Sequence, residues 1–277
     1  MIQRTIAHQR QKIRIARLAR TLICAAFCCG LLQRCNSPKS ATADGGEGTR
    51  PLENFSPAQP SALLATIEGT VRAIGNIPSL APRNTSEATQ KICGAQIANR
   101  TLVVGDAGAL ANAVVSWADA PAIPLGDAES PEPPVVDQRR CEYLPPVLAV
   151  RAGAQIEIRN SDPLLHNVHA KNSGSFFNFA MPIQGFKVRK QLPRSAMTIQ
   201  LSCDVHPWMH AVIRTFEHPY FAVTDATGRY RLEGIPTGKQ KLVFWHERFP
   251  EKRIEIDALP SKPTRADLEW SASELQL

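Results

Sequence analysis

After about residue 62, hydrophobic and polar residues alternate in short runs that are separated by Gly, Pro, Asn and Asp. Alternation with a period of two is typical of β-strands, because successive side chains point to opposite faces of a sheet. No long run has a helical period. The pattern therefore predicts an all-β sandwich or barrel. The predicted strands are Ala65–Arg72, Thr101–Val104, Ala113–Trp117, Val147–Val150, Gln155–Arg159, Val168–Ala170, Met197–Cys203, Ala211–Phe216, Tyr220–Thr224, Arg229–Leu232 and Lys241–His246.

The first 43 residues differ from the rest of the chain. They hold eight Lys and Arg side chains, no Asp or Glu, and the short apolar run Thr21–Leu32. A basic segment followed by such a run is typical of a secretory signal, and the run is too short to span a bilayer as a helix. We expect residues 1–43 to be a signal peptide or membrane-anchoring leader, cleaved after Ala43, lipidated at Cys35 or retained. The protein is then exported to the periplasm or cell envelope.

The leader also explains the basic net charge of +7. Removing its eight basic side chains from the 32 Lys and Arg leaves 24, against 25 Asp and Glu. A nearly neutral remainder has no positive surface for a phosphate backbone, so we expect no nucleic-acid partner. Membrane association would come only through the leader. Residues 44–62 are rich in Gly, Pro, Ser and Ala, which predicts a flexible, disordered linker.

Three of the seven cysteines follow the leader: Cys93, Cys141 and Cys203. In an oxidising compartment two of them are expected to pair, which leaves one thiol over.

The richest segment for chemistry is Cys203-Asp-Val-His206-Pro-Trp-Met209, with a thiol, an imidazole and a thioether within seven residues. A Cys, two His and a weak axial Met describe a blue-copper centre. The second imidazole is expected from His166, which follows a predicted strand and a turn at Asp162. Zinc is the main competing metal, but it prefers a firmer fourth ligand than Met.

Strand alternation supports this ligand choice. Ile199, Leu201 and Cys203 share one face of a predicted strand, so the thiol should point into the interior. His166 and His169 are an odd number of residues apart and should face opposite ways. We choose His166 as the ligand because it is nearer to the turn.

The segments Asn160–His169 and Cys203–Met209 together resemble the cupredoxin family of blue-copper proteins, over roughly residues 135–217. The resemblance implies a Greek-key β-sandwich that binds one type 1 copper ion. It assigns the ligands as His166, Cys203, His206 and Met209. It also implies that the backbone N–H of Asn167 donates to the Cys203 sulfur, and that the Asn167 side chain joins the two ligand loops.

Three residues fall outside the simple cupredoxin pattern. We interpret Cys93 and Cys141 as a disulfide, with Cys141 as an additional copper ligand the alternative. His210, directly after Met209, is interpreted as a surface residue, with a rival ligand role the alternative.

The C-terminal flank, Tyr220–Glu247, carries Thr-Asp-x-x-Gly-x-Tyr and Pro-x-Gly patterns and resembles a carboxypeptidase regulatory-like β-sandwich. Ile67–Val71 and Asn112–Val115 look like the beginning of the same Ig-like module. We therefore expect the copper domain to be associated with this second, split β-sandwich. The predicted division is 63–134 as an N-terminal β region, 135–217 as the copper domain and 218–277 as the rest of the second sandwich.

These features predict a copper electron carrier that cycles between Cu(I) and Cu(II) and is not an enzyme. Its redox partner is expected to dock near His206, Pro207 and Trp208. A multicopper enzyme would place a His before the copper Cys, where this chain has Ser202. The alternatives are a periplasmic copper carrier or scavenger, and a metal-free adhesion or carbohydrate-binding sandwich.

Overall fold

The computed structural model describes residues 63–126, 132–172 and 174–276. All of them belong to one compact unit, Pro57–Leu277. The leader expected at 1–43 and the linker expected at 44–62 lie outside the described residues. None of the described helices is long and apolar enough to cross a membrane. The described chain is built mainly from β-strands, so the expected all-β class is confirmed.

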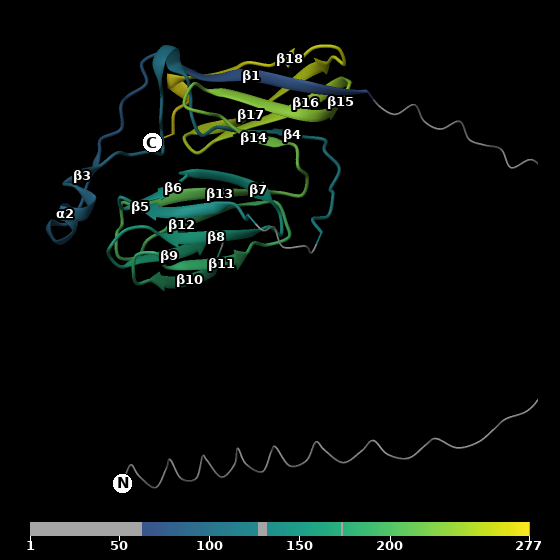
Figure 1. Ribbon diagram of the computed structural model, residues 1–277. Coiled ribbons are helices and arrows are strands. Elements are labelled where there is room, and N and C mark those ends of the chain that lie inside the picture. Colours follow the sequence, from purple (N-terminus) through teal and green to yellow (C-terminus); the bar gives the residue numbers. More distant parts are fainter. Residues whose placement is uncertain (1–62, 127–131, 173, 277) are drawn as a thin grey trace, which may run out of the picture. The chain divides into compact units, whose positions relative to one another are not determined.

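The central segment of the chain, residues 135–216, forms two sheets (Figure 1). In the first sheet the strand order is β10-β9-β12-β13-β7, and β7 pairs with β13 in parallel. In the second the order is β11-β8-β5-β6, with β5 and β8 parallel. The strands of the first sheet are β7 (Val147–Arg151), β9 (His166–Lys171), β10 (Ser175–Met181), β12 (Met197–Ser202) and β13 (His210–Phe216). Those of the second are β5 (Val135–Arg139), β6 (Glu142–Leu144), β8 (Gln155–Asn160) and β11 (Lys187–Gln191).

Alternate side chains of these strands bury a shared apolar core. In β9 every second residue from His166 onward is buried, and in β12 Ile199 and Leu201 are fully buried. This period of two places one face of each strand toward the interior. The same core includes Cys203 and Met209, so the loop after β12 stays at the end of the core and does not leave for solvent.

Strands from both flanks of the central segment pair with one another. β1 and β4 precede the segment, and the strands with which they pair follow it. One sheet contains β1 (Leu64–Ile74), β15 (Arg229–Pro236), β18 (Thr264–Arg265) and β19 (Leu268–Ser271). The other contains β4 (Val114–Trp117), β14 (Phe221–Val223), β16 (Gly238–His246) and β17 (Phe249–Ala258). Their apolar faces form a separate core that includes Ile67, Phe244 and Trp270.

Between β1 and β4 the chain leaves these sheets. Its short elements are β2 (Arg83–Asn84), η1 (Glu87–Thr89), α2 (Gln90–Cys93), β3 (Gln96–Ile97) and η2 (Asp106–Gly108). We call residues 83–97 the strap. A disulfide joins Cys93 of the strap to Cys141, which lies between β5 and β6. The disulfide thus joins the strap to the central segment.

The strand predicted at Thr101–Val104 is wrong. Only Val104 forms a bridge, with Leu110, and the residues before it are not part of a strand. Alternation alone cannot supply a neighbouring strand. Here the Thr101 hydroxyl hydrogen-bonds to the side chain of Asn99, which favours a local turn.

Candidate metal centre

Neighbouring strands bring the two predicted ligand loops to the same end of one sheet. β9 begins at His166, and β12 ends at Ser202, directly before Cys203. The two strands are antiparallel neighbours, with Ser202 opposite His169. The start of one strand therefore lies beside the end of the other, and residues that are distant in sequence meet there.

Three of the four predicted ligands converge in the interior. The ligand atoms of His166, Cys203 and His206 all lie within 4.8 Å of one another. The Nδ1 atoms of the two histidines are 2.9 Å apart, and the Cys203 sulfur is 3.7 Å from Nδ1 of His206. Exposure of the three residues is 0%, 3% and 5%, respectively. Such a shielded group of one sulfur and two ring nitrogens has the composition of a metal site.

The loop that carries Cys203, His206 and Met209 curls back on itself. The N–H of His206 donates to the carbonyl of Cys203 at 3.3 Å, and the N–H of Met209 donates to the carbonyl of His206 at 3.0 Å. These successive turns keep the loop at the end of the sheet. Met209 is buried and packs in the same apolar core as Cys203.

Asn167 connects the two loops. Its backbone N–H donates to the Cys203 sulfur at 3.3 Å, and its side-chain oxygen accepts from the N–H of Asp204 at 3.1 Å. Its amide nitrogen donates to the side chain of Asn178 at 2.6 Å. The first two contacts are those that the family resemblance implied for this residue.

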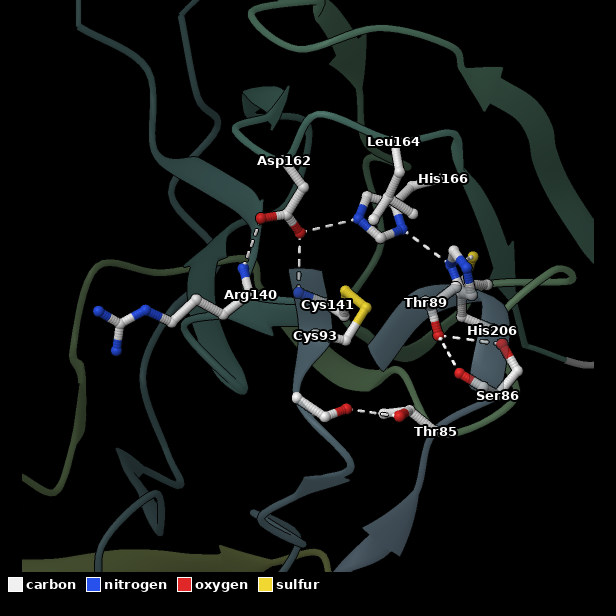
Figure 2. The surroundings of a disulfide bond; sticks show 12 residues. Thr85, Ser86, Thr89, Cys93, Arg140, Cys141, Asp162, Leu164, His166 and His206 are labelled. Atoms are coloured by element: carbon white, nitrogen blue, oxygen red, sulfur yellow. Dashed lines mark hydrogen bonds and ion pairs between the residues drawn. A yellow bond between two sulfur atoms is a disulfide. The ribbon is translucent and has the colours of Figure 1, made fainter. Parts of the chain in front are cut away.

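The sequence predicts Asp162 only as part of a turn, but in the structure it belongs to the site. Its Oδ2 lies 2.9 Å from Nε2 of His166, on the opposite side of the ring from His206 (Figure 2). Its two carboxylate oxygens also accept from the backbone N–H groups of Arg140 and Cys141, at 2.7 and 2.8 Å. The available signal was its position four residues before His166, but an Asp before Pro is also typical of a plain turn.

The site favours a thiolate at Cys203. Burial raises the pKa of this thiol, but hydrogen bonds with His166, His206 and backbone N–H groups outweigh burial and lower the pKa to about 6. Burial lowers the pKa of His166, but Asp162 and Cys203 together outweigh burial and raise that pKa. Burial also raises the carboxyl pKa of Asp162, but hydrogen bonds from His166 and the two backbone N–H groups outweigh burial. The net result is a lowered pKa. A thiolate available at neutral pH is the form that binds metals.

The alternative ligands have other partners. Cys141 shares a disulfide with Cys93, so its sulfur is no thiolate. Nε2 of His210 lies 2.6 Å from a carboxylate oxygen of Glu247. Nδ1 of His169 lies 2.9 Å from a carboxylate oxygen of Asp204, as expected for the outward face of β9.

The donor chemistry fits copper. One soft sulfur anion, two imidazoles and a buried thioether in the adjoining core suit this metal. Zinc would require a firm fourth ligand. Asp162 lies outside the group formed by Cys203 and the two histidines. Its oxygens contact His166 and two backbone N–H groups instead.

No protein family model matches this chain, and no curated protein matches it. Solved structures similar to part of it include the Cu-containing nitrite reductase (NirK) from Thermus scotoductus SA-01, at 22% identity and a TM-score of 0.29. That match covers 35% of this chain and 26% of the reductase. Amicyanin from Paracoccus versutus (Thiobacillus versutus) is similar at 19% identity and a TM-score of 0.29, over 37% of this chain and 97% of amicyanin. A mutant of amicyanin in its reduced state is similar at 21% identity and a TM-score of 0.29, over 37% of this chain and 98% of the mutant chain.

Proposed function

We propose that this chain is an exported mononuclear type 1 copper protein that transfers single electrons. His166, Cys203, His206 and Met209 would hold the ion. The observation that carries the proposal is the convergence of one thiol and two imidazoles within 4.8 Å, from loops that are distant in sequence. Copper bound by these residues would supply a Cu(I)/Cu(II) couple.

The surrounding contacts suit electron transfer. Asn167 joins the two ligand loops, Asp162 holds the His166 ring, and Met209 is packed in the core. Ligands that are held in place before the metal binds have little freedom to rearrange. A pocket of this kind suits both oxidation states, so electron exchange requires little movement of the protein.

The proposed docking surface lies around the His206 loop. Only a small part of His206 reaches the surface, while Val205 is 48% exposed and Pro207 is exposed. Trp208 is half-buried, and its ring centroid is 5.0 Å from that of His206. We propose that a redox partner binds here through a small interface, as is common for brief electron-transfer encounters.

The burial of the donor groups favours an electron carrier over a copper scavenger, because a buried ion exchanges less readily. A multicopper enzyme would require a second metal site. The residue before Cys203 is Ser202 and not a His. The other possible metal group among the described residues includes Cys141, whose sulfur is in a disulfide. We therefore propose a carrier and not an enzyme.

The disulfide between Cys93 and Cys141 supports the proposal of export, because disulfides persist mainly in oxidising compartments. Cell fractionation tests this part. We expect the protein in the periplasm or cell envelope with the disulfide formed, whereas a reduced cytosolic pool would contradict export.

The function itself is tested by redox titration of the purified, copper-loaded chain. We expect one copper per chain and a reversible one-electron couple that survives repeated cycles in the presence of a competing chelator. A metal that leaves for the chelator on each cycle would instead identify a copper carrier. Failure to retain copper, with firm retention of zinc, would overturn both roles.

A further inference from the structure

The turn between β5 and β6 has an unusual backbone. Arg139 pairs with Glu142, so Arg140 and Cys141 form a two-residue turn. Both turn residues have positive φ, 53° and 60°. Turns of this kind favour Asn and Gly, because other residues rarely adopt a left-handed backbone. Something outside the turn must therefore hold it.

Two residues outside the turn, Asp162 and Cys93, hold it. The consecutive N–H groups of Arg140 and Cys141 both donate to Asp162, one to each carboxylate oxygen. The Cys141 side chain is bonded to Cys93 of the strap. Asp162 itself is 5% exposed, so its carboxylate is held in the interior by these groups and not by bulk water.

The third partner of Asp162 is a proposed copper ligand. An ionised carboxylate can only accept hydrogen bonds, so Nε2 of His166 must carry the hydrogen in the 2.9 Å contact. In the neutral ring, Nδ1 is then unprotonated. That atom faces Nδ1 of His206 (Figure 2). Both rings belong to the group that includes the Cys203 sulfur.

The strap also reaches the second ligand loop. The guanidinium of Arg83 donates to the carbonyl of Trp208 at 2.9 Å. Leu164 and Trp208 pack against the buried cluster of Cys93, Ile97 and Cys141. The disulfide is thus packed against residues of both ligand loops.

We propose that Asp162 is a positioning residue: supported by the disulfide-bonded turn Arg140–Cys141, it selects the His166 tautomer that presents Nδ1 to the metal. The copper part of this inference rests on the proposed function. The tautomer part does not, because it concerns the metal-free protein.

The tautomer is measured by long-range ¹H–¹⁵N correlation NMR on the full metal-free chain, at a pH where His166 is neutral. We expect the Nε2–H form in the wild type and a mixture of tautomers in Asp162→Ala. Asp162→Asn is the milder variant, because it keeps one acceptor oxygen but cannot serve all three donors. Asp137→Ala is the matched control, since Asp137 accepts from Ser161 in the same loop but does not contact a ligand.

Copper retention gives a second readout. Removing a partner of a ligating His typically weakens metal binding by about 10- to 100-fold. We expect a loss of this size in Asp162→Asn, with a changed visible spectrum, and no loss in Asp137→Ala. A Cys93→Ala/Cys141→Ala double variant should show a smaller change in the same direction, without introducing a new thiol.

The outcomes separate the two proposals. An unchanged Nε2–H tautomer in folded Asp162→Ala and Asp162→Asn would overturn the positioning role. A double variant identical to the wild type in tautomer and copper retention would overturn the part assigned to the disulfide. A changed tautomer in a chain that never binds copper would support positioning while overturning the proposed function.

Discussion

The Nδ1 atoms of His166 and His206 lie 2.9 Å apart, although 40 residues separate the two histidines. Both rings are buried, and their planes meet at 73°. At this separation the two nitrogens can share one hydrogen in a hydrogen bond of the metal-free protein. A metal ion bound by both rings would take the place of that hydrogen and join the two loops directly.

The first prediction is that copper stabilises the fold through His166. At free copper 100 times the dissociation constant, the gain in the free energy of unfolding should be about 2.7 kcal/mol. Thermal unfolding with and without copper measures it. His166→Ala should lose most of this gain. His169→Ala is the control, because His169 lies on the same strand but contacts Asp204. Equal loss in the two variants would contradict the ligand assignment.

The second prediction concerns pH. In the metal-free protein the pKa of Cys203 is lowered to about 6, from about 8.5 for an ordinary thiol. Ultraviolet absorbance of the thiolate, with Cys203→Ala as baseline, should therefore titrate near pH 6. The pKa of Cys203 is lower in the folded protein than in the unfolded chain. The thiolate therefore makes its full contribution to the free energy of unfolding above the pKa of the unfolded chain. This contribution declines as pH falls and is gone below about 6. An ordinary midpoint, above roughly 8, would show that the two imidazoles do not act on the sulfur.

The third prediction concerns Asn167. Asn167→Ala removes the acceptor for the N–H of Asp204 but keeps the backbone N–H that donates to the Cys203 sulfur. We expect a loss of about 1 kcal/mol in the free energy of unfolding, measured by denaturant titration, with the copper–thiolate band retained. Complete loss of the band would mean that the side chain, and not the backbone, maintains the site.

The fourth prediction is that the disulfide contributes substantially to stability. Cys93 and Cys141 are 48 residues apart, for which loop-closure entropy gives about 4 kcal/mol. The Cys93→Ala/Cys141→Ala variant should unfold at correspondingly lower denaturant concentration. Mass spectrometry after alkylation without reduction should find one free thiol among these two residues and Cys203. Three alkylated thiols would contradict the disulfide.

Local alternation predicted much of the central segment. Ile199, Leu201 and Cys203 point into the core, and His166 and His169 occupy opposite faces of β9, as their spacing indicated. These features depend only on the period of a strand. A strand's existence also depends on its neighbours, and so Thr101–Val104 was predicted wrongly.

Other elements carry little signal in the sequence. β11, with the sequence KVRKQ, has exposed and half-buried residues only, and it is a strand because it pairs with β8. The role of Asp162 was missed for a related reason. Its contacts with Arg140 and Cys141 cross between loops, and the left-handed backbone that makes them possible is not visible in the residue types Arg and Cys.

The visible and EPR spectra of the copper-loaded chain, recorded beside those of Cys203→Ala, test the central claim most directly. We predict an intense visible band from the bond between copper and the Cys203 sulfur, with a matching EPR signal from one Cu(II) per chain. Both should vanish in the variant. A wild-type protein that binds copper without this band, and a variant that binds it equally well, would contradict the proposed centre.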